Sequence, residues 1–97
     1  MLILVTYDVN ITSEGGKKRL RKIAKICLDY GMRVQNSVFE CHVDTAQFVV
    51  LKNELMKVFD PEKDSLRFYF LGKKGRRKVE HVGAKSVSDV LHDTLIL

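Results

Sequence analysis

A single carboxylate at the end of an apolar run is the first candidate for chemistry in this sequence. Residues 1–5 are an unbroken aliphatic run, and the chain turns polar at Asp8–Asn10. Such a run is typical of a central strand that is buried on both faces. Helix-covered sheets usually present polar groups at the ends of central strands, so Asp8 is a candidate catalytic or metal-binding residue. The alternative is an aspartate that ends a strand and makes a local turn hydrogen bond.

One candidate carboxylate per chain limits the chemistry that this strand end can support. Mg²⁺ is usually held by one or two carboxylates together with waters and substrate phosphate. A dimer whose two-fold axis passes near Asp8 would bring two copies of this carboxylate together. The two negative charges would repel, and a divalent cation would relieve that repulsion.

Two basic segments are candidates for phosphate binding. One is the first half of an expected helix, over Lys17–Lys25, and the other is the glycine-containing loop at Lys73–Lys78. A solvated charged surface is the alternative interpretation, because the net charge of +5 and the pI near 9.4 are modest for a nucleic-acid-binding protein. The candidate phosphate contacts are Lys17, Lys18, Arg19, Arg21, Lys73, Lys74, Arg76 and Arg77.

Length and composition exclude several classes of protein. Ninety-seven residues make one domain, and no apolar stretch approaches the ~20 residues that span a bilayer. The N-terminal run lacks the features of a signal peptide, so we expect a cytoplasmic protein that has no membrane partner. The sequence holds two cysteines, Cys27 and Cys41, outside any C-x-x-C pair, and this favours buried structural thiols over a zinc site.

Hydrophobic periodicity predicts the elements that position these residues. A helix over residues 17–30 would begin after Thr12 or Ser13 as N-cap and end at Gly31, and a second would run from Asp44, with Gln47 completing a capping box, to Pro61. Strands are predicted within the first ten residues and over residues 33–43, 65–71, 78–82 and 94–97. The second of these should carry a bulge or bend near Asn36-Ser37.

These elements predict a two-layer α+β sandwich of the ferredoxin-like βαββαβ type. We expect a single domain over residues 1–97, with a core at 1–82 and a C-terminal dimerisation segment at 83–97. The apolar Leu95-Ile96-Leu97 has no place in a four-stranded monomer, so this last strand is expected to be exchanged or added across a homodimer.

Two motifs at this spacing resemble the CRISPR-associated protein two family. They are Tyr7-Asp8-Val9 at the first strand end and Gln35-x-Ser37-Val-Phe39-Glu40 in the second strand, together with Arg33. The resemblance also covers the chain length, the basic first helix and the short C-terminal strand. An RNA-recognition domain on the same architecture is less favoured, because residues 66–73 lack its spaced glycine-aromatic pattern.

The resemblance implies a Mg²⁺- or Mn²⁺-dependent endonuclease that cuts double-stranded DNA or single-stranded RNA and serves in the spacer-acquisition complex. The alternative is a non-catalytic DNA-binding bridge between integrase dimers. The resemblance also implies a homodimer, a CRISPR integrase partner, and Asp8 as the metal ligand in both chains. Arg19 and Arg21 would correspond to the family's helix-one arginines. Arg33 and Phe39 would contact substrate or be structural, Tyr7 would neighbour the site, and Ser37 belongs to the matching strand motif.

Overall fold

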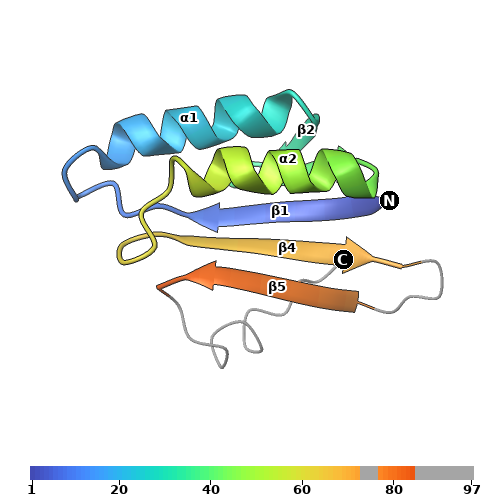
Figure 1. The fold of residues 1–97 in the computed structure, drawn as a ribbon. Helices are drawn as coiled ribbons and strands as arrows, with labels where there is room; N and C mark the ends of the chain where they lie inside the picture. The colour runs from blue at the N-terminus through green and yellow to red at the C-terminus, as the bar shows by residue number, and fades with distance from the viewer. Residues whose placement is uncertain (73–76, 85–97) are drawn as a thin grey trace.

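The chain folds around its first strand. The computed structural model describes residues 1–72 and 77–84. Within them β1 (Leu2–Asp8) is the middle of a five-stranded antiparallel sheet with the order β2-β3-β1-β4-β5 (Figure 1). The other elements are α1 (Gly16–Leu28), β2 (Gly31–Gln35), β3 (Val38–His42), α2 (Thr45–Met56), β4 (Ser65–Leu71) and β5 (Arg77–Gly83).

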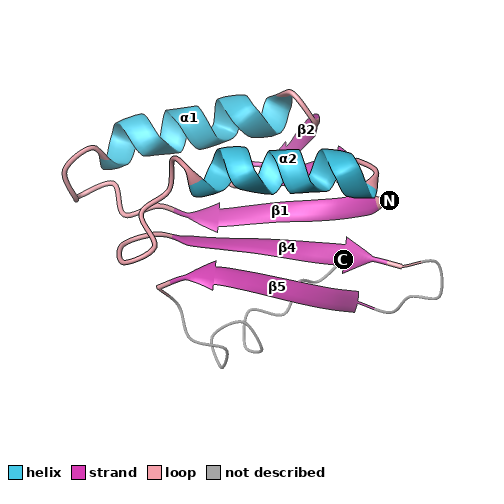
Figure 2. Ribbon diagram, in the orientation of Figure 1, coloured by secondary structure: helices cyan, strands magenta, loops and turns pink. Residues whose placement is uncertain are grey.

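The two helices cover one face of the sheet (Figure 2). Ile3, Val5 and Tyr7 of β1 point into this layer and are buried, as are Leu66 and Phe68 of β4. The intervening β1 residues lie on the opposite face, because successive side chains of a strand alternate. The β1 run is apolar throughout because its strand is central, and Leu4 is also buried on the face without helices.

This architecture confirms the predicted ferredoxin-like α+β fold. β1 pairs with β3 on one side and with β4 on the other, and all pairs of neighbouring strands are antiparallel. The strand predicted over residues 65–71 is β4, in which Leu66 and Phe68 face the helices while Arg67 and Tyr69 face away. β5 lies beyond β4 and pairs with its full length, from Ser65 opposite Gly83 to Leu71 opposite Arg77.

The prediction of one strand over residues 33–43 is wrong, because the segment forms a hairpin of two strands. β2 and β3 pair with each other, and Asn36-Ser37 is the turn between them. The irregularity expected there does occur, since the pairing shifts register between Arg33 and Gln35. A polar pair within a β-branched run suits either a bulge or a turn, and only the tertiary pairing distinguishes them.

Both ends of the first helix differ from the prediction, and a glycine is involved at each end. Gly15 is the N-cap of α1, in the left-handed conformation with φ 74°, and so neither Thr12 nor Ser13 is the cap. The helix ends at Leu28, and Gly31 instead begins β2. A Cβ atom at Gly31 would lie 2.0 Å from the backbone oxygen of Glu40, so close strand pairing explains this glycine better than helix capping does.

The second helix begins as predicted but ends earlier. Asp44 accepts a hydrogen bond from the Gln47 amide at 2.7 Å, and the Gln47 side chain accepts one from the Asp44 amide at 2.9 Å. This reciprocal capping box confirms the predicted start. The helix ends at Met56, with Lys57 as C-cap, so Pro61 lies in the following turn and does not terminate it.

Some predictions lie outside the described residues. They are the loop residues Lys73, Lys74 and Arg76 and the strand at residues 94–97. Within the described part of the chain, no helix is long and apolar enough to cross a membrane.

Candidate functional site

The carboxylate of Asp8 is exposed where β1 leaves the sheet. Two hollows meet at this residue. One has a volume of about 390 Å³ and is lined by residues 8–12, residues 63–65 and Ala84. The other has a volume of about 170 Å³ and lies on the face of the sheet without helices, between Asp8, Ser37 and Arg67. Asp8 is therefore reachable by solvent, ions and phosphate groups.

The face that carries Asp8 brings a guanidinium and hydroxyl groups beside it. Asp8 lies opposite Ser65 in the β1–β4 pairing, and Thr6 lies opposite Arg67. Because residues two apart on a strand share a face, these four side chains form one patch. Arg67 is only 7% exposed, and with Asp8, Thr6 and Ser65 it lines the smaller hollow. A phosphate that entered this hollow would meet a positive charge and hydroxyl donors.

A second carboxylate near Asp8 has a different environment. The Asp64 side chain is fully buried and bound by the Arg19 guanidinium, with Nε to Oδ2 at 2.8 Å and Nη2 to Oδ1 at 3.1 Å. It also accepts hydrogen bonds from the backbone amides of Asn10 at 3.0 Å and Asp60 at 2.9 Å. Burial alone would raise the pKa of Asp64, but these hydrogen bonds outweigh it and lower the pKa below its ordinary value.

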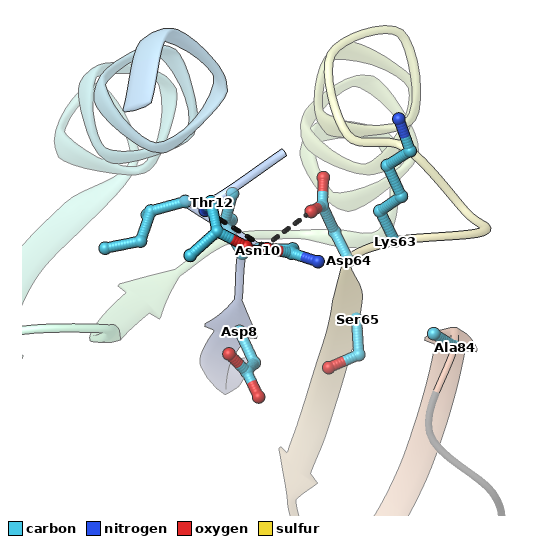
Figure 3. Close-up of a pocket in the computed structure, with 9 residues that line it drawn as sticks. Asp8, Asn10, Thr12, Lys63, Asp64, Ser65 and Ala84 are labelled. Carbon is cyan, nitrogen blue, oxygen red and sulfur yellow. Dashed lines mark hydrogen bonds between the residues drawn. The ribbon is translucent and has the colours of Figure 1, made fainter. Parts of the chain in front are cut away.

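The two carboxylates point to opposite sides of the sheet. In Figure 3 the Asp64 carboxylate is directed toward Asn10, whereas the Asp8 carboxylate and the Ser65 hydroxyl point the other way. Lys63 extends toward the helix layer, away from Asp8 (Figure 3). Asp64 therefore belongs to the interior of this corner of the molecule, and Asp8 to its surface.

The aromatic residues predicted near the site lie under the helices. Tyr7 and Phe39 are buried in the core and stacked, with ring centroids 6.1 Å apart. The Tyr7 hydroxyl donates to the Asn36 carbonyl at 3.3 Å, and burial raises the pKa of this phenol. The Arg33 guanidinium lies 5.2 Å from the Phe39 ring centroid. The structure thus does not bring Arg33 or Phe39 together with Asp8.

The predicted basic residues occupy three different places. Lys17, Lys18 and Arg21 are exposed on the first half of α1, at the same end of the molecule as Asp8 but in the helix layer (Figure 1). Arg19 is bound to Asp64. Arg77 pairs with Leu71 at the other end of the sheet, about 20 Å from Asp8 by the ~3.3 Å rise per strand residue.

Asp8 fits a divalent cation only as part of a larger ligand set. Among the described residues, no group of three or more histidine, cysteine, aspartate or glutamate side chains could hold a metal ion. Asp64 is already committed to Arg19 and two backbone amides. One chain therefore offers Asp8 with neighbouring hydroxyl oxygens and open space for waters, which suits Mg²⁺ with few protein ligands.

Three residues around Asp8 were not predicted from the sequence as site residues, namely Asp64, Ser65 and Arg67. For Arg67 a signal was present, because a charged residue interrupts the apolar alternation of β4 on the face that Asp8 shares. For Asp64 no local signal exists, since its importance depends on Arg19, 45 positions away in the chain.

Comparison with known proteins finds relatives that cover most or all of this chain. The sequence model of the family described as CRISPR associated protein Cas2 matches residues 1–79. The chain is 59% identical over 97 residues to the CRISPR-associated endoribonuclease Cas2 of Chlorobaculum tepidum, and each chain is covered completely. It is 60% identical over 96 residues to the CRISPR-associated endonuclease Cas2 of Halalkalibacterium halodurans, and 99% of each chain is covered.

A solved structure agrees with the sequence matches. The crystal structure of Streptococcus pyogenes Cas2 at pH 6.5 is similar to this chain, with a TM-score of 0.70 and 59% sequence identity. The match covers 75% of this chain and 88% of the other. The fold and the sequence therefore point to the same family.

Proposed function

Since the chain belongs to the CRISPR associated protein Cas2 family, we propose that it is an endonuclease that cuts phosphodiester bonds and a subunit of the spacer-acquisition complex. Its relatives in Chlorobaculum tepidum and Halalkalibacterium halodurans, which match it over nearly their whole length, are named as an endoribonuclease and an endonuclease. The observation that carries the proposal is the exposed carboxylate of Asp8, which shares a hollow with the cation Arg67.

Asp8 is the proposed ligand of a Mg²⁺ or Mn²⁺ ion. Bound there, the ion would supply an activated water and neutralise negative charge on the phosphate. Because the described part of the chain offers a single exposed carboxylate at this place, we propose that Asp8 of a second copy completes the ligand set in a homodimer. The exposed strand end and the adjoining hollows leave room for a shared ion.

The side chains around Asp8 would bind and orient the substrate backbone. Arg67 carries a charge that is nearly buried, so its attraction for a phosphate is screened less than that of a surface lysine. The hydroxyls of Ser65 and Thr6 can donate hydrogen bonds to phosphate oxygens. The phosphate backbone that this patch would bind is common to both nucleic acids, so both duplex DNA and single-stranded RNA remain proposed substrates.

A non-catalytic DNA-binding bridge to a CRISPR integrase is the second proposed function. The exposed Lys17, Lys18 and Arg21 lie in the helix layer, whereas Asp8 faces the opposite side of the sheet. A duplex bound along α1 would therefore not place its backbone at Asp8 of the same chain. Such separation suits a protein that holds DNA for a partner enzyme.

The test is a cleavage assay with labelled duplex DNA and single-stranded RNA, in Mg²⁺, in Mn²⁺ and in chelator. Asp8→Asn keeps the shape of the side chain and removes its charge, so it should lower metal-dependent cleavage at least about 100-fold, because losing outer-shell partners of a metal ligand already costs about 10- to 100-fold. Asp29→Asn makes the same change at an exposed position outside the site and should cleave like wild type.

Cleavage by Asp8→Asn at the wild-type rate would refute the proposed nuclease site. If wild type shows no cleavage in either ion yet binds duplex DNA and an integrase subunit, the bridging function is correct. Circular dichroism of Asp8→Asn should match wild type, because the exposed Asp8 side chain is not part of the core.

A further inference from the structure

A buried ion pair organises the corner of the molecule from which Asp8 emerges. The pair is Asp64 with Arg19, and its carboxylate also holds the backbone amides of Asn10 and Asp60. It therefore joins the loop after β1, the first turns of α1 and the turn before β4. All of these lie at one end of the sheet (Figure 1).

Arg19 extends this network along the loop. Its Nη1 donates to the Glu14 carbonyl at 2.8 Å, and its Nη2 donates to the Ser13 hydroxyl at 2.7 Å. The Arg19 side chain is only 14% exposed, so little of the guanidinium remains for other contacts. The planar guanidinium of arginine can bond Asp64 and the loop at Ser13 and Glu14 at the same time. The single ammonium group of lysine could not make all of these contacts.

The loop that this pair holds has little room to move. Ser13 donates from its amide and its hydroxyl to the Asn10 carbonyl, and Thr12 donates from both groups to the Asn10 side-chain oxygen. A Cβ atom at Gly16 would lie 2.2 Å from the Asn10 carbonyl oxygen, so the start of α1 packs directly on the loop. The path of the chain after Asp8 is thus set by close contacts.

The backbone around Asp8 is fixed at two points, one on the neighbouring strand and one in the loop that follows. The Asp8 backbone lies opposite Ser65, which follows Asp64 directly, and Asn10, two residues after Asp8, donates its amide to Asp64. Fixing these two points sets the direction in which the Asp8 carboxylate leaves the sheet. A displacement of about 1 Å at a reacting group can cost about 100-fold in rate.

We propose that Asp64 and Arg19 are positioning residues that fix the backbone around Asp8, and that Arg19 acts through this pair and not by contacting phosphate. This role rests on the proposed function, in which the Asp8 carboxylate binds the metal ion. It separates Arg19 from the exposed Lys17, Lys18 and Arg21 of the same helix.

Two variants test the pair. Arg19→Lys keeps the charge but loses the fork, and Asp64→Asn keeps the shape but removes the carboxylate. In ¹⁵N-labelled protein, each should speed hydrogen exchange of the Asn10 and Asp60 amides about tenfold or more, because their acceptor is lost or displaced. The Phe48 amide, which bonds to the Asp44 carbonyl in α2, should stay protected and serves as the internal control.

Kinetics and salt dependence distinguish positioning from phosphate contact. Arg19→Lys should lower kcat about 10- to 100-fold with KM unchanged. Arg19→Gln should leave the slope of log affinity against log salt for a labelled duplex equal to that of Lys57→Gln, which removes one exposed charge outside α1 and outside the Asp8 site. If Asp64→Asn does not fold, Arg19→Lys and Arg19→Gln carry the test.

Unchanged exchange of the Asn10 amide in Arg19→Lys would overturn the positioning role. So would faster exchange with unchanged kcat. If the slope for Arg19→Gln is less steep than that for Lys57→Gln by about 0.9, Arg19 is a phosphate contact. Because exchange is measured without substrate, a failure here is distinguishable from a failure of the proposed nuclease, which Asp8→Asn tests separately.

Discussion

At the scale of single residues, two aspartates of one corner differ because of their surroundings. Asp8 is exposed at a strand end, and Asp64 is buried against Arg19. Because the pKa of Asp64 is lowered in the folded protein, its contribution to stability is present above the ordinary carboxyl pKa. That contribution is lost as the pH falls through the lowered folded-state value. Asp8 could be recognised from the sequence as a candidate site residue because it follows an apolar run. No feature of the local sequence marks Asp64 as a buried aspartate.

The cysteines give a prediction at this scale. Both are fully buried free thiols in the core, which confirms their expected structural role. Burial raises the pKa of Cys27 to about 12 and of Cys41 to about 11. Since the thiolate is the reactive form, neither thiol should react with a disulfide reagent in the native protein at pH 8, while both should react after denaturation. Rapid modification of either thiol in the native state would contradict this packing.

At the scale of elements, the hydrophobic patterns identified both helices and the strands β1, β4 and β5, but they merged β2 and β3 into one strand and missed some boundaries. The capping box of α2 could be predicted because Asp44 and Gln47 are three residues apart and act locally. The hairpin at Asn36-Ser37 could not, because a turn and a bulge use similar residues. Gly31 was wrongly predicted to cap the first helix for a similar reason. A Cβ atom at this position would clash with the backbone of Glu40 on the neighbouring strand, and this contact cannot be read from the local sequence.

The basic face of α1 is the element whose function is tested most simply. Replacing Lys17, Lys18 and Arg21 with glutamine should weaken duplex DNA binding equally for unrelated sequences. Each lost phosphate contact should reduce the slope of log affinity against log salt by about 0.9. Lys57 is an exposed lysine outside α1, and its glutamine and alanine variants serve as controls. If the slope of the triple variant equals that of the controls, the basic half of α1 is a solvated surface.

At the scale of the whole molecule, the sheet separates two kinds of surface. The helix layer carries the exposed basic residues of α1, and the other face carries Asp8, Arg67 and the hydroxyls of Ser65 and Thr6. The two-layer fold could be predicted because the apolar stripes of two helices need one sheet face to cover. The homodimer stays a prediction, because the apolar strand at residues 94–97 on which it depends lies outside the described residues.

We propose that the Asp8 carboxylates of two chains share one divalent cation. Titration of the metal-free protein with Mn²⁺, followed by the electron paramagnetic resonance signal of the free ion, measures this directly. Wild type and Asp29→Asn should bind one Mn²⁺ per two chains at this site, and Asp8→Asn should lose it. Binding of one ion per chain would contradict a shared site, and an unchanged affinity in Asp8→Asn would contradict Asp8 as the ligand.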